Sequence, residues 1–429
     1  MAPVCARSCD RAVPRLRRFL LERIVRVVQV EGRIRSGLRS GERVSAGVLF
    51  VLAGCGQTSR DSQASAEPTL PPAEPCAFSQ HQVSEDGQNV DDVPTGLAWN
   101  GSGYGAVWQT VEPGLSAPSV VGRFALLSPD GHRLSDEDRE VTAQTTGFSL
   151  AFTGNGYGMS WGTGSSVQLS LLDASGAAIG FPRSLLSDTR TPLTSIAFGG
   201  DGFGVAWDRG YFAALDLNGQ IGAISAGGQY PGDPPRVVFT GDGYAIVWPD
   251  ENSDSPGKPS SAIYFASFRS DGTPLVTRAR VSPSYGASEA VSHPELLWTG
   301  DSFALAYNET VWGTTTISFR AHFVRFDRAG QALTSVLSWP ARIAGMTSIG
   351  EESAVLYFNG EGAPSQLSLA RLDAAGARRV QDAIVADLRP SQRLLSPVIV
   401  NDGAYTFTWI GAQGSSSSNQ LYFGRAECP

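Results

Sequence analysis

One short phrase recurs seven times between residues 93 and 412 of this chain. Each copy has an apolar run, a glycine-containing turn, and a second apolar run that ends in Trp or Tyr. The copies end at Trp108, Trp161, Trp207, Trp248, Tyr307, Tyr357 and Trp409. A repeat of about 40–60 residues is typical of a propeller or a solenoid, because each unit buries its apolar face only against a neighbour.

The second copy, Ser149–Trp161, shows why the phrase predicts a β-hairpin. Asn155-Gly156 is predicted to form a two-residue hairpin turn, for which Asn-Gly is the strongest short signal. After it, large residues alternate with small ones up to Trp161, which is the period of two that a strand requires.

A second hairpin follows in most copies, around a turn that contains Asp and Gly. The recurrent turn aspartates are Asp130, Asp173, Asp216, Asp271, Asp327 and Asp373. An aspartate there is expected to accept hydrogen bonds from its own turn and not to belong to a ring of acidic ligands. Two hairpins per repeat give four antiparallel strands, the content of one propeller blade.

Small residues occupy the position three before the closing aromatic of every copy: Gly105, Gly158, Gly204, Ala245, Ala304, Ala354 and Thr406. Small side chains there would let the next sheet approach closely. The sequence therefore predicts blades that pack face to face around a ring.

The strand count predicts how the ring closes. The seventh repeat has a hairpin at Ser396–Trp409 and a third strand at Gln420–Ala426, and then the chain stops. The stretch Ala77–Ser84 resembles the fourth strands of other repeats. We therefore expect an all-β fold at residues 76–429, a seven-bladed β-propeller of four-stranded antiparallel blades closed by an N-terminal strand.

Two cysteines bracket this domain. Cys76 and Cys428 are the only cysteines after Cys55, and each abuts a strand assigned to the seventh blade. In an oxidising compartment they are natural disulfide partners. The alternative is a pair of free thiols.

The first 54 residues carry the character of a leader. Residues 1–43 contain eleven arginines against four acidic residues, and an uncharged run, Val44–Cys55, follows. The run is too short to span a bilayer and is typical of a signal-peptide core. It ends in Leu52-Ala53-Gly54-Cys55, which resembles the lipobox of bacterial lipoproteins.

That resemblance implies that Cys55 is lipidated and becomes the first residue of the mature protein. The alternatives are an ordinary signal peptide or a chance match, and translation could begin nearer Val28 to Val44. Residues 55–75 are rich in Ser, Pro, Gln and Ala, and are expected to form a disordered tether. Gly56 follows the cysteine, where Asp would signal inner-membrane retention, so the resemblance implies the outer membrane of the cell envelope.

The charge of the chain bears on its partners. The total is −8, and the arginine surplus of the first 43 residues leaves about −15 on the remainder. An acidic body repels phosphate, so nucleic acid is not an expected partner.

The repeat also resembles those of bacterial extracellular and surface proteins with the form F-x-G-x-x-Y-x-V-x-W followed by D-x-x-G, which are expected to be β-propellers. The resemblance covers roughly residues 93–427 and implies an architecture, not an activity. Trp207-Asp208 looks like the closing pair of a WD40 blade, but the other copies lack that Asp and its Gly-His partner, so this is not a WD40 sequence.

Few residues suggest chemistry. The four histidines are His81, His132, His293 and His322. Each lies in a different repeat unit, and none is two or four residues from another, so a metal site or a Ser-His-Asp triad would need convergence that only folding provides. We therefore predict no catalytic residue, no metal and no cofactor.

Two further features are weak candidates. Asp250–Asp254 begins like a calcium loop, but Ser255 replaces the required Gly and Ser261 the final Glu, so an acidic surface loop is favoured. Trp312 and Trp339 fall outside the repeated positions, and one or both could contact a glycan or protein ligand instead of packing in the core.

These observations predict a membrane-anchored lipoprotein whose monomeric, non-catalytic propeller serves as a binding or scaffolding platform for a protein or glycan at the bacterial cell envelope. The alternative is a propeller-fold polysaccharide hydrolase or lyase. It would need two or three carboxylates that converge at the ring centre.

Overall fold

A computed structural model of the chain describes residues 70–85, 89–90, 95–112, 119–135, 138–143, 146–164, 166–186, 193–225, 233–252, 260–359, 365–378, 380–388, 396–412 and 418–429. All of these belong to one compact unit, Glu67–Pro429. The leader, Cys55 and the first part of the expected tether lie outside the described residues.

The described strands form seven antiparallel sheets of four strands each. Blade 1 contains β2 (Gly96–Trp99), β3 (Tyr104–Glu112), β4 (Ser119–Leu127) and β5 (Arg139–Ala143). Blade 2 contains β6 (Thr146–Phe152), β7 (Gly156–Thr163), β8 (Ser166–Asp173) and β9 (Ala178–Leu186). Blade 3 contains β10 (Thr194–Phe198), β11 (Gly202–Trp207), β12 (Tyr211–Asp216) and β13 (Ile221–Ser225), with a short 3-10 helix η1 (Asp208–Gly210) between its second and third strands.

Blade 4 contains β14 (Arg236–Phe239), β15 (Gly243–Asn252), β16 (Ser260–Arg269) and β17 (Pro274–Arg280). Blade 5 contains β18 (Glu289–Trp298), β19 (Phe303–Trp312), β20 (Ile317–Phe326) and β21 (Leu337–Trp339). Blade 6 contains β22 (Arg342–Ile349), β23 (Glu352–Asn359), β24 (Ser365–Leu372) and β25 (Ala383–Leu388). Blade 7 contains β26 (Ile399–Asn401), β27 (Ala404–Gly411), β28 (Gln420–Glu427) and the N-terminal β1 (Ala77–Gln82).

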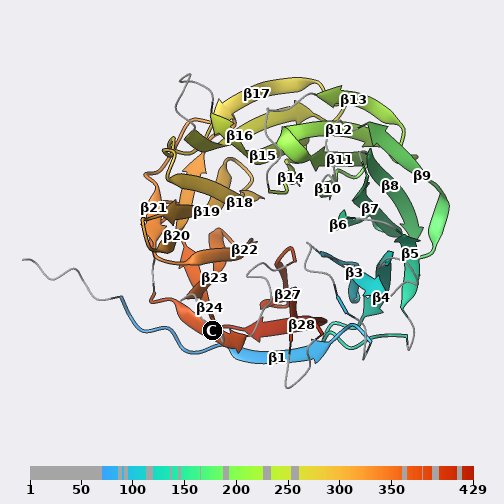
Figure 1. Cartoon of the computed structure of the whole chain (residues 1–429), viewed down its shortest axis with the longest axis horizontal. Coiled ribbons are helices and arrows are strands. Elements are labelled where there is room, and N and C mark those ends of the chain that lie inside the picture. The colour runs from blue at the N-terminus through green and yellow to red at the C-terminus, as the bar shows by residue number, and fades with distance from the viewer. Residues whose placement is uncertain are drawn as a thin grey trace, which may run out of the picture. The chain divides into compact units, whose positions relative to one another are not determined.

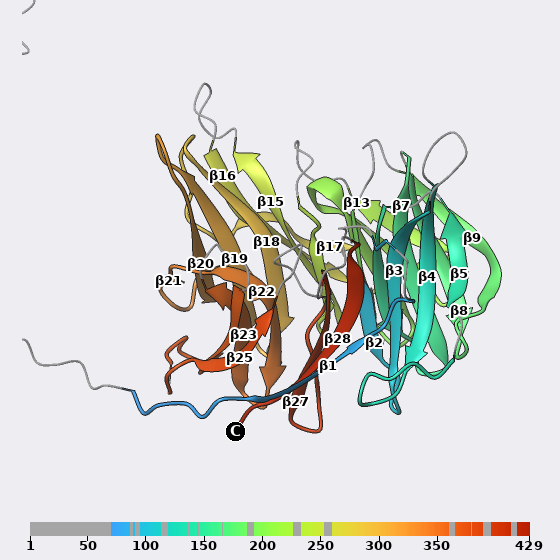
Figure 2. The same ribbon diagram turned by 60° about the horizontal axis from the view of Figure 1, so that its bottom comes forward.

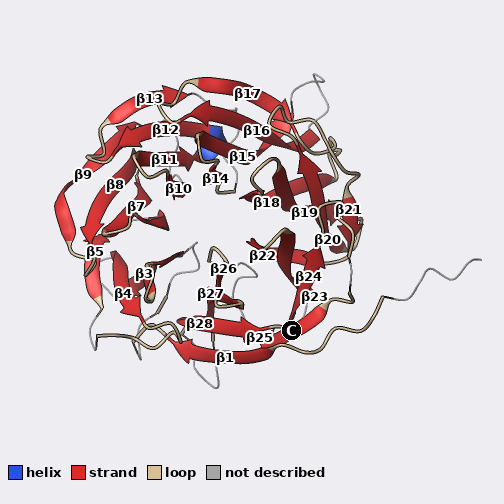
Figure 3. Cartoon of the chain, turned by 180° about the vertical axis from the view of Figure 1, so that it is seen from behind, coloured by secondary structure: helices blue, strands red, loops and turns tan. Residues whose placement is uncertain are grey.

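The seven sheets stand around a common axis as a β-propeller (Figure 1). The first strand of each blade lies nearest the axis, and the fourth strand forms the outer rim (Figure 1). Figure 3 shows that η1 is the helix of the described part of the chain and that strands make up the rest of its regular structure. The prediction of a seven-bladed, all-β ring is confirmed, including the weak sixth copy.

The N-terminal strand closes the ring as predicted. β1 pairs antiparallel with β28, with Ala77 opposite Glu427 and Gln82 opposite Tyr422. Figure 2 shows β1 (blue) running beside β28 (red). A disulfide joins Cys76 to Cys428, whose Cα atoms are 4.2 Å apart. The first and last described strands are therefore fastened to each other both covalently and by backbone hydrogen bonds.

The small residues before the closing aromatics let neighbouring blades touch, as predicted. A Cβ atom added to Gly158 of blade 2 would lie 2.3 Å from Cε1 of Phe203 in blade 3. One added to Gly204 of blade 3 would lie 2.5 Å from Cδ1 of Tyr244 in blade 4. At both contacts an aromatic ring from the next blade fills the space that the missing side chain leaves.

The tight turns differ from the sequence prediction in one respect. In the turn between β6 and β7, Gly154 has a positive φ of +94°, and the Thr153 N–H donates to the carbonyl oxygen of Gly156. The turn therefore centres on Gly154-Asn155 instead of Asn155-Gly156. Glycine is required at the first of these positions because that φ is costly for other residues.

The second hairpins are looser than their sequences suggest. In blades 1, 5 and 6 the residues after the Asp/Gly turn form a single isolated bridge, and the fourth strand begins several residues later. Asp173, Asp216, Asp271, Asp327 and Asp373 behave as predicted: Asp173 Oδ1, for example, accepts hydrogen bonds from the N–H groups of Ser175 and Ala177, both 2.9 Å long. In blade 1 the equivalent position is Ser128, whose hydroxyl accepts the His132 N–H.

Candidate functional site

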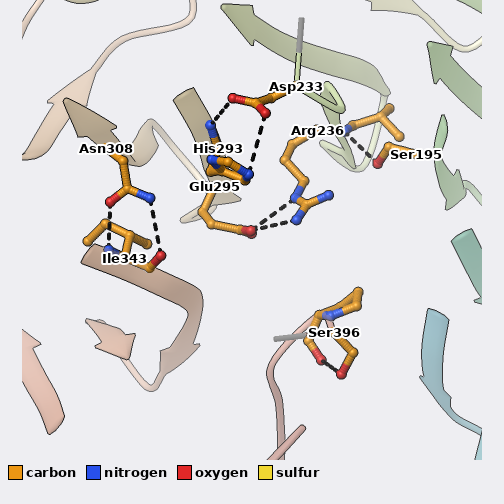
Figure 4. Close-up of polar contacts among 10 residues, drawn as sticks. Ser195, Asp233, Arg236, His293, Glu295, Asn308, Ile343 and Ser396 are labelled. Carbon is orange, nitrogen blue, oxygen red and sulfur yellow. Dashed lines mark hydrogen bonds and ion pairs between the residues drawn. The ribbon is translucent and has the colours of Figure 1, made fainter. Parts of the chain in front are cut away.

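Four charged or titratable side chains meet near the axis, where blades 4 and 5 adjoin (Figure 4). Asp233 and Arg236 come from the entry to blade 4, and His293 and Glu295 come from β18 of blade 5. Because β14 and β18 are the first strands of their sheets, both lie on the inner side of the ring (Figure 1). We refer to these four residues as the axial cluster.

One half of the axial cluster is an ion pair. Arg236 donates to Glu295 Oε1 through Nη2 at 2.7 Å and through Nε at 3.0 Å. The side chains are 22% and 13% exposed, so the pair is shielded from water without being sealed from it. Burial disfavours the guanidinium charge, but Glu295 more than compensates and raises the pKa of Arg236 above its usual value.

The other half centres on a strained histidine. His293 has a φ of +50° although it is not glycine, and β18 skips from Ser292 to Glu295 in its pairing with β19, which is a β-bulge. Asp233 holds this conformation: Oδ2 accepts the His293 backbone N–H at 3.1 Å, and Oδ1 lies 3.4 Å from Nε2. Backbone strain of this kind persists only where surrounding contacts enforce it, and it concentrates at functional sites.

Burial lowers the pKa of His293, and the attraction of Asp233 opposes that effect only in part. The imidazole is therefore neutral at pH 7. Its Nε2 faces the Asp233 carboxylate, so Nε2 carries the proton and Nδ1 is the acceptor nitrogen. The axial cluster thus combines guanidinium donors with carboxylate and imidazole acceptors.

Hydrogen bonds between blades hold the first strands in register around the axis. Asn308 of β19 accepts the Ile343 N–H at 2.6 Å and donates to the Ile343 carbonyl at 3.2 Å (Figure 4). On the other side of the axial cluster, the Ser195 hydroxyl accepts the N–H of Val237 at 3.2 Å. These contacts cross from blade 5 to blade 6 and from blade 3 to blade 4, so the backbone that carries the cluster is fixed on both sides.

The carboxylates of the axial cluster can be compared with those of a glycosidase. Such enzymes use two carboxyl groups that work as an acid and as a base or nucleophile across the scissile bond. Here Asp233 is engaged by His293 and Glu295 by Arg236. Each carboxylate already has a basic partner, so the geometry suits recognition better than proton transfer.

The remaining histidines are distributed as follows. His81 of β1 and His132 of the turn after β4 lie with ring centroids 3.9 Å apart, a convergence that the sequence spacing gave no reason to expect. Burial, with His132 adding to it, lowers the pKa of His81. His322 lies in β20, where its ring contacts Glu309 and Ser338, each through a 2.7 Å hydrogen bond.

The candidate calcium loop is described only at its start. Asp250 is buried and accepts a 2.9 Å hydrogen bond from Arg278, and Asp254 and Ser255 lie outside the described residues. Ser261 is buried, and its hydroxyl accepts the Val291 N–H. Within the ranges that the structure describes, no group of three His, Cys, Asp or Glu side chains is arranged to hold a metal ion.

The two tryptophans outside the repeat differ in their surroundings. Trp312, near the tip of the β19–β20 hairpin, is 46% exposed, and its cross-strand partner Ile317 is also exposed. Trp339 is buried in a T-shaped contact with Tyr357 and beneath the Arg378 guanidinium. Trp312 therefore remains a candidate contact residue, and Trp339 packs in the core.

Sequence reasoning missed Asp233, Arg236 and Glu295. No local motif marks them, since 59 residues separate Arg236 from Glu295 in the chain. One signal was available: His293-Pro294 interrupts an otherwise regular strand, and a Pro within a strand marks a sheet edge or a bulge. Such an interruption indicates a bulge, and a polar residue at a bulge on an inner strand is a candidate for function.

No protein-family model matches the chain, and no curated protein matches its sequence. Solved structures with a similar course include the β-propeller domain of the trilobed protease of Pyrococcus furiosus, with 10% identity, a TM-score of 0.46, and coverage of 80% of this chain and 94% of that one. A polysaccharide lyase has 10% identity, a TM-score of 0.46 and coverage of 81% and 94%.

The acylaminoacyl peptidase of Pyrococcus horikoshii has 10% identity, a TM-score of 0.45 and coverage of 79% of this chain and 51% of that one. These structures are too distantly similar to indicate an activity for this chain. The assignment of a seven-bladed propeller rests on the strand pairing of the chain itself. Within the described part of the chain, no helix is long and apolar enough to cross a membrane.

Proposed function

We propose that the chain is a lipoprotein of the bacterial cell envelope whose propeller binds a glycan at the axial cluster. In this proposal Cys55 carries the lipid, residues 56–75 are the tether, and the propeller is a monomeric platform whose axial cluster binds without catalysing a reaction. The lipobox-like Leu52–Cys55 supports the anchor and Gly56 supports the outer membrane. The disulfide between Cys76 and Cys428 supports an oxidising compartment.

The observation that carries the binding role is the conformation of His293. A left-handed, bulged histidine costs about 1–3 kcal/mol of backbone strain. Asp233 bonds to both its backbone and its ring, so the contacts around it maintain that strain. A residue held in this way is preorganised, which is the property that a recognition site needs.

The chemistry of the axial cluster favours a glycan as the ligand. Sugar hydroxyl groups donate and accept hydrogen bonds at once, and the cluster offers both: guanidinium donors on Arg236, and acceptors on Asp233 and Glu295. Arg236 and Glu295 neutralise each other, and because His293 is neutral, Asp233 leaves the cluster with one net negative charge. This favours a neutral, polyhydroxylated ligand over a phosphate or a nucleic acid.

The binding experiment uses the full-length protein in detergent on an array of bacterial envelope oligosaccharides, followed by calorimetry with any glycan that binds. We expect His293→Ala to weaken binding about tenfold or more, because it removes the imidazole acceptor and the ring's contact with Asp233. His132→Ala, on an exposed turn far along the chain, is the matched control and should bind normally. Equal affinity of the two variants for the glycan would show that the axial cluster is not the binding site. If the protein captured another protein and bound no glycan, the proposal that the ligand is a glycan would be wrong.

The anchor is tested separately by fractionating cells that express Cys55→Ser. We expect this variant to leave the membrane fraction, because a thiol is needed for acylation. Retention in the membrane would mean that another segment is the anchor. Since the two experiments use different residues and readouts, the anchor and the binding site can fail independently.

A further inference from the structure

Blade 5 contains a second polar cluster, on its outer three strands and away from the axial cluster. His322 of β20 lies opposite Tyr307 of β19 and opposite Ser338 of β21 in the strand ladder. Residue 309 lies two positions beyond Tyr307 and so faces the same side of the sheet. Three adjacent strands therefore place Glu309, His322 and Ser338 side by side on one face.

The three side chains form a continuous hydrogen-bonded chain. Nε2 of His322 lies 2.7 Å from Oε2 of Glu309, and Nδ1 of His322 lies 2.7 Å from Oγ of Ser338. A carboxylate only accepts hydrogen bonds, so Nε2 must carry the imidazole proton. Nδ1 is then the acceptor, and the Ser338 hydroxyl donates to it. This is the arrangement of roles in a Ser–His–carboxylate triad, with the two imidazole nitrogens exchanged.

The three hydrogen-bonded side chains differ sharply in burial. The side chains of Glu309 and His322 are 2% and 6% exposed, whereas Ser338 is exposed on the outermost strand. The ring of Tyr307 stacks on His322 at a centroid distance of 4.9 Å, and the hydroxyl of Tyr285 is bonded to that of Tyr307 at 2.9 Å. The base and the carboxylate that orients it are thus shielded from water, while the hydroxyl group is accessible.

Elsewhere a serine bonded to a carboxylate has a simpler setting. Ser175 donates to Asp173 Oδ1 at 2.7 Å inside an exposed hairpin turn, where the interaction caps the turn. No such turn exists at Ser338, which lies within a strand and points at a nitrogen base. If the His322–Glu309 pair only stabilised the fold, the imidazole would not need to bond to an exposed serine.

We propose that Ser338 is a nucleophile activated by His322, and that blade 5 hydrolyses small, activated acyl esters at its outer edge. Ser338 Oγ would bond to the acyl carbon while its proton passes to Nδ1 of His322. The ester C–O bond then breaks, and the leaving alcohol takes that proton. Water attacks the acyl-serine and gives a proton to Nδ1, the acid departs, and the serine oxygen takes the proton back.

Two features of the surroundings fit this reaction. β21 is the edge strand of its sheet, so alternate backbone N–H groups point to its open side, where they could donate to an oxyanion. Burial lowers the pKa of His322, so the imidazole is the free base at neutral pH. The other charged or titratable groups that face it are Glu309, Arg320, whose Nη1 lies 3.9 Å from Glu309, and the tyrosines 285 and 307.

The test treats the full-length protein with a fluorophosphonate probe and locates the adduct by mass spectrometry. In this reaction Oγ bonds to phosphorus and fluoride leaves, so a labelled serine reports nucleophilicity without knowledge of the substrate. We expect Ser338 to be labelled at least about a hundredfold faster than Ser175, the size of a general-base contribution. Glu309→Gln should slow the labelling, and Ser338→Ala should abolish that adduct without unfolding the protein, since the side chain is exposed.

The pH dependence of labelling on the unaltered protein gives an independent readout. Labelling of Ser338 should rise as His322 loses its proton, below the ordinary pKa of about 6.5, and should be level at neutral pH. Attack by an unassisted serine would instead keep rising tenfold per pH unit. Labelling of Ser338 no faster than that of Ser175, or a rate that climbs without a plateau, would overturn the proposal. Neither outcome affects glycan binding at the axial cluster, which uses other residues.

Discussion

The closure of the ring makes a quantitative prediction about the disulfide. β1 is mostly exposed, and its main apolar contact is Phe78, whose ring stacks on Phe407 at 6.3 Å. The strand is also held by its ladder with β28, by the Cys76–Cys428 bond, and by contacts of His81 with His132 and of Gln82 with Gln420. Replacing both cysteines by serine removes the covalent link while leaving the ladder and Phe78 in place.

The size of the effect follows from the loop that the bond closes. A sequence separation of 352 residues gives about 6 kcal/mol in the chain-entropy treatment of the unfolded state. This is a ceiling, because residual structure in the unfolded chain already restricts it, and native disulfides typically contribute about 2–5 kcal/mol. We therefore expect the double variant Cys76→Ser/Cys428→Ser to lose about 2–5 kcal/mol of unfolding free energy.

The assay is equilibrium urea unfolding of the oxidised protein and the double variant, with amide hydrogen exchange under native conditions. Exchange should increase first in β1 and β28, since these strands lose the bond that fastens them. The control is a reducing agent, which should lower the stability of the unaltered protein to that of the variant and should not affect the variant itself.

Two outcomes would refute this reasoning. The first is an unfolding free energy that changes by less than about 0.5 kcal/mol, which is the ordinary scatter of surface substitutions. The second is an increase in exchange that is equal in all seven blades. That result would mean that the ring opens as one unit and that the seam has no special role.

Two further predictions concern packing and protonation. Gly158→Ala, which would bring its Cβ to 2.3 Å from Phe203, should cost about 1–3 kcal/mol of unfolding free energy in urea titrations, whereas Gly222→Ala, with its nearest neighbour at 3.5 Å, should cost little; equal losses would contradict close blade packing. Because burial lowers the pKa of His322, its stabilising contribution is complete above about pH 6.5 and is lost as the pH falls through the lowered value. The unaltered protein should therefore lose more thermal stability between pH 7.5 and 5 than His322→Gln does, and parallel losses would argue against a buried neutral imidazole.

The architecture could be predicted from the sequence because every blade of a propeller has a similar sequence pattern. Each copy of the repeat has alternating side chains in its strands and a small residue three positions before the closing aromatic. The last copy lacks a fourth strand, which indicated that Ala77–Ser84 supplies it. The structure differs in detail, with β1 ending at Gln82 and the blade 2 turn centred on Gly154-Asn155. These differences are local: the shifted turn changes the register of one hairpin, with Phe152 opposite Tyr157, and leaves the order of the strands and the number of blades unchanged.

The candidate sites were not readable in the same way, because each depends on contacts that the repeat does not specify. Asp233 meets His293 only because the entry to blade 4 and the bulge of β18 both lie on the inner side of the ring. Part of the second cluster could have been found: a hairpin turn at 313–316 places Tyr307 opposite His322. The pairing of His322 with Ser338 could not, since an irregular stretch separates β20 from β21.

The partner of the closing aromatic shows where blade 5 departs from the repeat. Trp207, Trp248 and Trp409 each lie opposite a tyrosine on the third strand and stack on it, with centroids 5.6, 6.0 and 5.3 Å apart. In blade 5 the pair is Tyr307 and His322, with centroids 4.9 Å apart. The two rings still stack, but the third strand supplies an imidazole where those three blades have a tyrosine ring.

That exchange is costly unless the imidazole has partners, because a buried polar ring without them loses its hydration. Glu309 and Ser338 supply those partners, and neither is required by the propeller architecture. The same blade also carries the bulge that turns His293 toward Asp233. A repeat protein tolerates a residue that breaks the repeat only where neighbouring contacts offset its cost. Blade 5 has two such residues, His293 and His322, and each has partners that stabilise it. Blade 5 is therefore the part of this ring where function is most strongly expected.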